Sequence, residues 1–256
     1  MRLLAAIAAL GFALLAAEGA RAERLTIAVS APEVKIDSSF TGINITVFGV
    51  IADQALSSAD GRSYHVAVLI LGPAETAVVR RKDRVAGVWM NGAAETVLRP
   101  ASFYDLSSSG PIDELAEPAV LGQLGLGFEH IPFVFDGRGE VNDPDAAEFR
   151  KAFIRLKQKQ GLFNQQLGVN FVAPQIFRTD MRLPANIPVG RYAVIAYLFD
   201  GKNLLANAQQ TIEVSTTGIE ATLAGFARGQ SLVYGILCAG LALFVGWLGG
   251  VIFRRD

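Results

Sequence analysis

Cysteine and histidine are almost missing from this chain of 256 residues. The single cysteine, Cys238, lies inside a long apolar run near the C-terminus, so the rest of the chain has neither a disulfide nor a reactive thiol. Only His65 and His130 supply imidazole, and the motifs Gly-x-Ser-x-Gly, His-Glu-x-x-His, Gly-x-x-x-x-Gly-Lys and Cys-x-x-Cys do not occur. We therefore expect no catalytic residue, no metal site and no cofactor.

An excess of basic residues is also missing. Lys and Arg total 23, Asp and Glu total 24, and the formal net charge is −1. Domains that bind nucleic acid carry a strong positive balance, because much of their affinity comes from contacts with phosphate. The composition therefore argues against nucleic acid as a partner.

What the chain does have is an uninterrupted apolar segment at its C-terminal end, Leu232–Phe253, followed directly by Arg254 and Arg255. A helix rises about 1.5 Å per residue and a bilayer core is about 30 Å thick, so this segment is long enough to cross a membrane once. We predict a transmembrane helix over residues 232–253 and a short tail over residues 254–256.

The first residues, 1–22, have the features of a secretory signal peptide. Arg2 precedes an apolar stretch, Leu3–Ala17, and the segment closes on Ala20-Arg21-Ala22, with small residues where a signal peptidase requires them. We expect cleavage before Glu23. The alternative is an uncleaved first anchor.

An exported N-terminus and two arginines after the C-terminal run agree with the positive-inside rule. In a bacterium, this orientation places a domain of residues 23–218 in the periplasm and a juxtamembrane segment at 219–231. The span then crosses the inner membrane and the tail lies in the cytoplasm. In a eukaryote, the same features would describe a single-pass surface protein.

Between the two ends, apolar and polar residues alternate with a period of two in segments rich in Val, Ile, Phe and Tyr, as in half-buried strands. The residues between 107 and 135 are rich in Gly and Pro and are expected to be loop, with room for a short helix at 112–117. The predicted strands are 25–29, 43–51, 64–71, 76–81, 84–90, 171–177, 191–199 and 204–214.

One segment of the body has the period of a helix instead. Asp143 can cap it, and apolar residues fall on one stripe between Asp145 and Gln160, before Gly161 ends it. The stripe consists of Phe149, Ala152, Phe153 and Leu156. Many short strands and one helix predict a mainly β fold, an immunoglobulin-like antiparallel β-sandwich with one inserted amphipathic helix, followed by the transmembrane helix.

A basic hairpin is the candidate ligand-binding site in the body. Strands 76–81 and 84–90 are expected to be joined at Lys82-Asp83. Cations near an aromatic residue suit an anionic ligand or phospholipid headgroups. The alternative is an ordinary charged turn. The residues of this candidate site are Arg80, Arg81, Lys82, Arg84 and Trp89.

Two other polar segments are interpreted as solvated surface. Asp136–Asp143 has oxygen ligands at short spacing, but Arg138 stands where an early calcium ligand should be. The predicted helix carries cations that we expect to face water. They are Arg150, Lys151, Arg155, Lys157 and Lys159.

Small residues recur every four positions along the predicted span, at Cys238, Ala242, Gly246 and Gly250. A face of small residues lets a second helix approach closely, which is how helices associate inside a bilayer. We predict that Ala242, Gly246 and Gly250 pack against a partner helix in the membrane. The alternative is that these residues only reflect how common glycine and alanine are in spanning helices.

Several segments together resemble the alphaproteobacterial putative transmembrane protein family. They are Ile43–Gly49, Arg80-Arg81-Lys82 through Gly87–Asn91, Pro188–Tyr192 and the C-terminal span ending in arginines. The resemblance implies bacterial origin and the same membrane topology, and it supplies no catalytic residue. Proteins of this kind are often encoded beside multi-spanning permeases of the sulfite-exporter type.

The leading hypothesis is a non-enzymatic accessory or interaction subunit of a membrane complex or transporter, with a multi-spanning inner-membrane permease as partner. The alternative is a periplasmic module that binds or senses small anions or lipid headgroups through the basic hairpin. A third class, an envelope enzyme, would need His65 or His130 clustered with carboxylates.

Overall fold

The structure is a computed structural model and describes residues 24–52, 64–85, 87–136, 144–217, 227 and 229–252. Several predicted features lie outside this part of the chain. They are the signal peptide, the polar segment Asp136–Asp143 after its first residue, most of the juxtamembrane segment and the arginines at 254–255. The strands are β1 (Arg24–Val29), β2 (Glu33–Ile36), β3 (Gly42–Ala52), β4 (Tyr64–Leu71), β5 (Ala77–Val85), β6 (Val88–Val97), β7 (Tyr104–Ser108), β8 (Phe163–Leu167), β9 (Asn170–Ala173), β10 (Ile176–Pro184), β11 (Gly190–Asp200) and β12 (Asn203–Thr216). The helices are α2 (Ile112–Leu115), α3 (Pro118–Leu124), α4 (Pro144–Lys159) and α6 (Ser231–Ile252).

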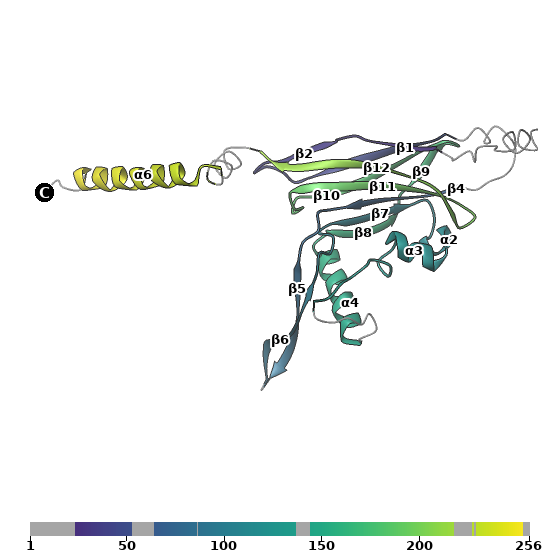
Figure 1. Cartoon of the computed structure of the whole chain (residues 1–256), viewed down its shortest axis with the longest axis horizontal. Helices are drawn as coiled ribbons and strands as arrows, with labels where there is room; N and C mark the ends of the chain where they lie inside the picture. The colour runs from purple at the N-terminus through teal and green to yellow at the C-terminus, as the bar shows by residue number, and fades with distance from the viewer. Residues whose placement is uncertain are drawn as a thin grey trace, which may run out of the picture.

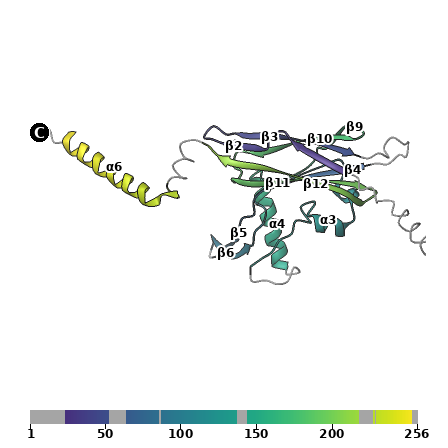
Figure 2. The ribbon, with the colours of Figure 1, turned by 45° about the horizontal axis from the view of Figure 1, so that its top comes forward.

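Two sheets form the body of the molecule. A four-stranded sheet has the order β1-β3-β10-β9, and a six-stranded sheet has the order β2-β12-β11-β4-β7-β8. The sheets lie face to face as two layers (Figures 1 and 2). The predicted antiparallel sandwich is confirmed; two pairings at the edges of the larger sheet, β2 with β12 and β7 with β8, are parallel.

The strand order is that of an immunoglobulin-like domain. β1-β3-β10-β9 takes the places of strands A-B-E-D, β12-β11-β4 those of G-F-C, and β7 and β8 extend the second sheet as C′ and C″ do. A tyrosine corner completes the likeness: Tyr192, near the start of β11, donates its hydroxyl hydrogen to the Pro188 carbonyl at 2.6 Å. Relative to an immunoglobulin-like domain, the β5–β6 hairpin and the helices α2 to α4 are insertions.

The core lies between the two sheets. Ile45, Phe177 and Phe199 are fully buried there. Gly49 makes room for Phe177, because a Cβ at position 49 would lie 2.0 Å from the phenylalanine ring. Close packing of this kind leaves no space for a larger residue without movement of the ring.

The helix predicted over 145–160 is confirmed, since α4 covers Pro144–Lys159 and Gly161 follows it with φ of +72°. Phe149 and Phe153 are buried as expected, but Leu156 is 51% exposed. The buried stripe of α4 is therefore narrower than the sequence pattern suggested.

Three other local predictions are wrong. The hairpin turns at Gly87, whose φ of +87° only glycine adopts easily, and not at Lys82-Asp83. The strand predicted over 171–177 is divided between β9 and β10. The segment predicted to be mostly loop contains α3 as well as α2 and includes the end of β7.

α6 confirms the predicted apolar helix. Residues Ser231–Gly250 are long and apolar enough to cross a membrane, with a mean hydropathy of 2.1, and none of this stretch is buried against the rest of the described chain.

Candidate anion-binding arm

The β5–β6 hairpin and α4 project together from one side of the sandwich (Figures 1 and 2). We call these elements the arm. The hairpin is inserted between β4 and β7, and α4 between α3 and β8, and α4 contacts both β5 and β8. Phe153 holds α4 to the body through edge-on contacts with Phe133 and Phe163, at ring-centroid distances of 5.4 and 5.8 Å. The arm is thus fixed to the sandwich by aromatic packing.

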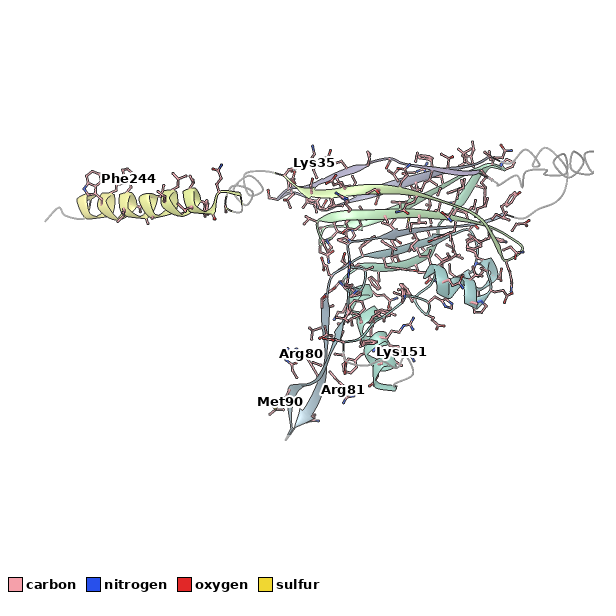
Figure 3. All side chains as sticks on the ribbon, viewed as in Figure 1. Lys35, Arg80, Arg81, Met90, Lys151 and Phe244 are labelled. Atoms are coloured by element: carbon pink, nitrogen blue, oxygen red, sulfur yellow. The ribbon has the colours of Figure 1, made fainter. Side chains whose placement is uncertain are left out.

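The structure divides the predicted basic cluster between the two faces of the hairpin. Side chains of successive strand residues point to opposite faces, so Arg80, Lys82 and Arg84 share one face of β5 and Arg81 points to the other. Figure 3 shows Arg80 on the side away from α4 and Arg81 on the side toward it. We call Arg80, Lys82 and Arg84 the outer face of the arm.

Cross-strand pairing places two more residues on this face of the backbone. Lys82 pairs with Asn91 and Arg84 with Trp89. The side chain of Trp89 lies outside the described part of the structure. Among the described side chains, no carboxylate forms an ion pair with any residue of the outer face, and Arg84 donates only a long hydrogen bond, 3.4 Å, from Nε to the Gly87 carbonyl.

A cleft of about 380 Å³ lies between β5 and α4. Arg81 Nη1 is 3.6 Å from Glu148 Oε2 across it. Lys151 and Arg155 come to the same cleft from α4, while Val79 and Phe149 form its apolar part. Arg80 also lines the cleft, and among the described lining residues four cations stand against one carboxylate, that of Glu148, which suits an anion.

Sequence reasoning did not find this meeting of two basic segments. It treated the cations of α4 as one solvated face, whereas the helix uses them in two ways. Arg150 donates to the carbonyls of Glu129 and Ile131, the latter at 3.0 Å, and burial lowers its pKa. Lys157 donates to the Ser102 carbonyl at 3.3 Å, and burial also lowers its pKa. Only Lys151 and Arg155 remain for a ligand in the cleft.

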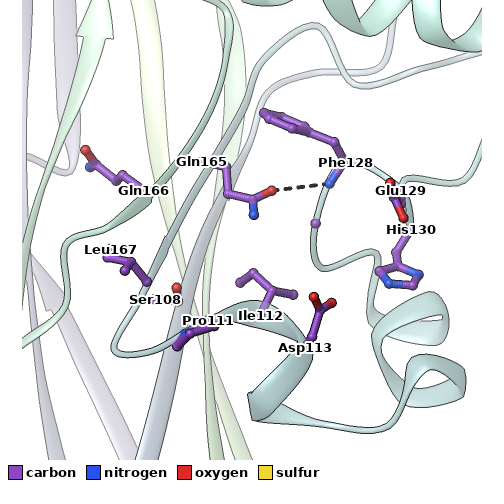
Figure 4. A pocket seen from close by; sticks show the side chains of 11 residues that line it. Ser108, Pro111, Ile112, Asp113, Phe128, Glu129, His130, Gln165, Gln166 and Leu167 are labelled. Atoms are coloured by element: carbon purple, nitrogen blue, oxygen red, sulfur yellow. Dashed lines mark hydrogen bonds between the residues drawn. The ribbon is translucent and has the colours of Figure 1, made fainter.

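A second cavity, of about 580 Å³, lies where the α2 segment and the loop of residues 127–130 meet β8 (Figure 4). Gln165 Oε1 accepts a hydrogen bond from the Phe128 amide at 3.3 Å, and Asp113, Glu129 and His130 stand at its rim. The sequence did not indicate this cavity. No group of three or more His, Cys, Asp or Glu side chains that could hold a metal ion occurs among the described residues.

The small residues of the span lie on a helix that touches nothing else in the described chain. Ala242, Gly246 and Gly250 are exposed, and a Cβ added at either glycine would meet no atom within 4 Å. No described part of the chain therefore supplies the helix against which these residues are predicted to pack.

An immunoglobulin-like body joined to a helix that can cross a bilayer defines a membrane protein with a β-sandwich domain. The chain belongs to the family described as putative transmembrane protein (Alph_Pro_TM), whose model matches residues 24–255. This match confirms the family resemblance predicted from the sequence.

Curated proteins give no match to the chain. Among solved structures, a similar one is AggA, the major subunit of aggregative adherence fimbriae type I from Escherichia coli. It is 14% identical with a TM-score of 0.26, over 76% of this chain and 95% of that one. So weak a similarity has no bearing on function.

Proposed function

We propose that this protein is a non-enzymatic accessory subunit of an inner-membrane complex. In this proposal the sandwich lies in the periplasm, α6 crosses the membrane once, and the C-terminus is cytoplasmic. The observation that carries the proposal is α6 itself, which is exposed along its length and aligns Ala242, Gly246 and Gly250 on one face. Such a face is suited to close packing against the helix of a multi-spanning permease.

Co-purification in a mild detergent tests this function. The wild-type protein should bring down a multi-spanning partner, and Gly246→Leu should weaken that association by preventing close approach of the two helices. Gly240→Leu is the matched control, because position 240 lies about 120° around the helix from position 246. Recovery of the free protein alone, or equal loss of partner with both variants, would contradict the proposal.

The arm favours a second function, the binding of a small anion or a lipid headgroup. Its support is the convergence of Arg81, Lys151 and Arg155 on one cleft together with the cations of the outer face. Sulfate, sulfite or phosphate should raise the melting temperature of the protein, because a ligand that binds only the folded state stabilises it. An unchanged shift in Arg81→Ala, or no shift with any of these anions, would remove the cleft from consideration.

A further inference from the structure

The arm begins at the end of the sandwich that leads into α6. β4, which precedes the hairpin, ends at Leu71, and this residue pairs with Ala193 near the start of β11. The first residue of β11, Gly190, pairs with Val214 near the end of β12 and lies against Pro73, which a Cβ at position 190 would approach to 3.0 Å. The root of the arm is therefore close to the point where β12 ends and the chain continues to the span.

Covalent length limits how far this end of the sandwich can lie from the bilayer. Residues 217–230 join β12 to α6, and a fully extended chain of this length reaches about 50 Å. The nine residues of β5 extend about 30 Å from the sandwich. Both dimensions allow the arm to reach the surface of the membrane in which α6 is held.

The outer face has the chemistry of a headgroup-binding surface. Arg80, Lys82 and Arg84 are spaced about 7 Å apart along β5. Three apolar side chains are exposed along the same hairpin: Val78 at 56%, Val88 at 64% and Met90 at 54%. Val78 lies on the outer face, whereas Val88 and Met90 pair with Val85 and Asp83 and so lie on the opposite face, close to the turn at Gly87.

The combination of cations and apolar side chains distinguishes between two sources of phosphate, a dissolved anion and the headgroups of a bilayer. A dissolved anion would use the cations alone and would leave the apolar side chains in water. A bilayer surface satisfies both, since phosphates meet the cations while apolar groups enter the boundary between headgroups and acyl chains.

We infer that the hairpin of the arm rests on the anionic headgroups of the membrane that α6 spans, so that the protein contacts its own bilayer at two separate places. This inference rests on the membrane anchoring of the proposed function, but it does not require a protein partner. The second contact would restrict rotation of the sandwich above the membrane and would present a constant side of it to any partner.

The test uses the full chain in lipid nanodiscs. Cys238→Ser with Val88→Cys provides one labelling site for a polarity-sensitive fluorophore, and a nitroxide attached to lipid headgroups serves as the quencher. In discs with about a third phosphatidylglycerol, the emission should shift to the blue and be quenched; in phosphatidylcholine discs, both effects should be much smaller and should not depend on salt.

Charge variants identify the residues responsible. Arg80→Gln with Lys82→Gln and Arg84→Gln should reduce quenching in anionic discs to the level of neutral discs. Lys35→Gln with Lys159→Gln and Lys202→Gln removes the same charge from surfaces outside the cleft and the outer face, and should leave quenching unchanged. Equal melting temperatures of the two triple variants would exclude a folding defect as the cause.

Trypsin on the unaltered chain gives an independent measurement. Cleavage after Arg80, Lys82 and Arg84, followed by mass spectrometry, should be slower in anionic discs than in neutral ones.

Equal cleavage and equal quenching in both lipids would overturn the inference, as would quenching that persists in the outer-face variant. If adding free phosphate to neutral discs removes the quenching that remains there, the hairpin binds small anions instead, and the inference is overturned. Failure of the anchoring itself would be seen earlier, as failure of the chain to enter discs.

Discussion

The sandwich and the arm are built from similar strands but are stabilised differently. In the sandwich, residues Val66–Ile70 of β4 are each at most 1% exposed. In the hairpin, the described side chains that are buried are those of Val79, Glu95 and Val97. A two-stranded hairpin is at best marginally stable in water, so this one depends on α4. The comparison shows a body that supplies stability and an arm whose side chains are left exposed for contacts.

The largest effect should come from the core of the sandwich. Phe177 is fully buried against Gly49 and meets Phe171 edge-on, with ring centroids 6.3 Å apart. Phe177→Ala should lower the free energy of unfolding by about 3–5 kcal/mol, because it leaves a cavity that rigid strands cannot close. Denaturant unfolding of the full chain in detergent measures this loss.

Phe48→Ala is the control for that substitution. Phe48 lies in the same sheet but is 43% exposed, and its ring contacts the Arg178 guanidinium at 5.9 Å. Its removal should lower the free energy of unfolding by less than about 1 kcal/mol. Similar losses in both variants would mean that the layer between the sheets is not the main source of stability.

A buried carboxyl group gives the sandwich a pH dependence. Asp105, on β7, is 1% exposed and accepts a hydrogen bond from Asn164 Nδ2 at 3.1 Å. Burial raises its pKa to about 6. The folded state therefore retains a proton that the unfolded state has released, and stability should fall as pH rises from about 4 to about 6, by roughly 3 kcal/mol in all.

Asp105→Asn should remove that dependence, since an amide cannot ionise but still offers Asn164 an acceptor. At pH 7 the variant should be more stable than wild type by up to about 3 kcal/mol. Asp180 gives the opposite sign: a hydrogen bond from the Thr46 hydroxyl lowers its pKa, so its contribution is lost as pH falls. A wild-type stability that is flat between pH 4 and 6 would contradict the role assigned to Asp105.

A smaller effect on global stability is expected from a substitution where the β5–β6 hairpin packs against α4. Phe149 is 4% exposed and forms the apolar part of the cleft with Val79. In Phe149→Ala, amide exchange in β5, β6 and α4 should accelerate about 100-fold while β4 and β11 keep their protection, because the arm can open without the sandwich. Leu156→Ala, on the exposed side of α4, should leave exchange unchanged. A uniform acceleration along the chain would show that arm and sandwich unfold as one unit.

The difference between the sandwich and the arm also explains how much of the structure could be predicted from the sequence. Two strands that line the core, β3 and β11, alternate clearly and were predicted almost to the residue. β7 and most of β10 also line the core but were missed, because polar residues such as Asp105 and Thr179 occupy buried positions in them. β2 and β8 were missed because they are short edge strands whose polar residues, among them Lys35 and Gln165, hide the period. A strand with one face in water carries apolar residues only on its buried face, so a short one shows few of them.

The candidate site was predicted only in part, for a different reason. The sequence identified Arg80, Lys82 and Arg84 as a basic cluster but put the turn at Lys82-Asp83, whereas the structure turns at Gly87 and places all three residues on β5. The sequence could not show that Arg81 would face Glu148 and Lys151, because these residues come from an insertion separated in sequence and are brought together by the packing of phenylalanines. Long-range contacts of this kind depend on the tertiary fold and leave no local pattern.

The ion pair inside the arm should contribute least to stability and most to ligand choice. Arg81 and Glu148 are 3.6 Å apart, but their side chains are 44% and 70% exposed, so water screens their attraction. Arg81→Gln and Glu148→Gln should each lower the free energy of unfolding by less than about 1 kcal/mol, and less still at high salt. The two substitutions nevertheless change the charge of the cleft in opposite directions.

Sulfate binding should therefore separate the two variants where stability does not. Glu148→Gln removes the carboxylate that competes with an anion for Arg81, Lys151 and Arg155, so calorimetric titration should show tighter binding than in wild type; Arg81→Gln should show weaker binding. Lys35→Gln, on β2 of the sandwich, is the matched control and should bind sulfate as wild type does. If both cleft variants bind sulfate equally, the anion does not occupy the cleft, and the contrast between a stabilising body and a ligand-contacting arm would then rest on the outer face of the hairpin alone.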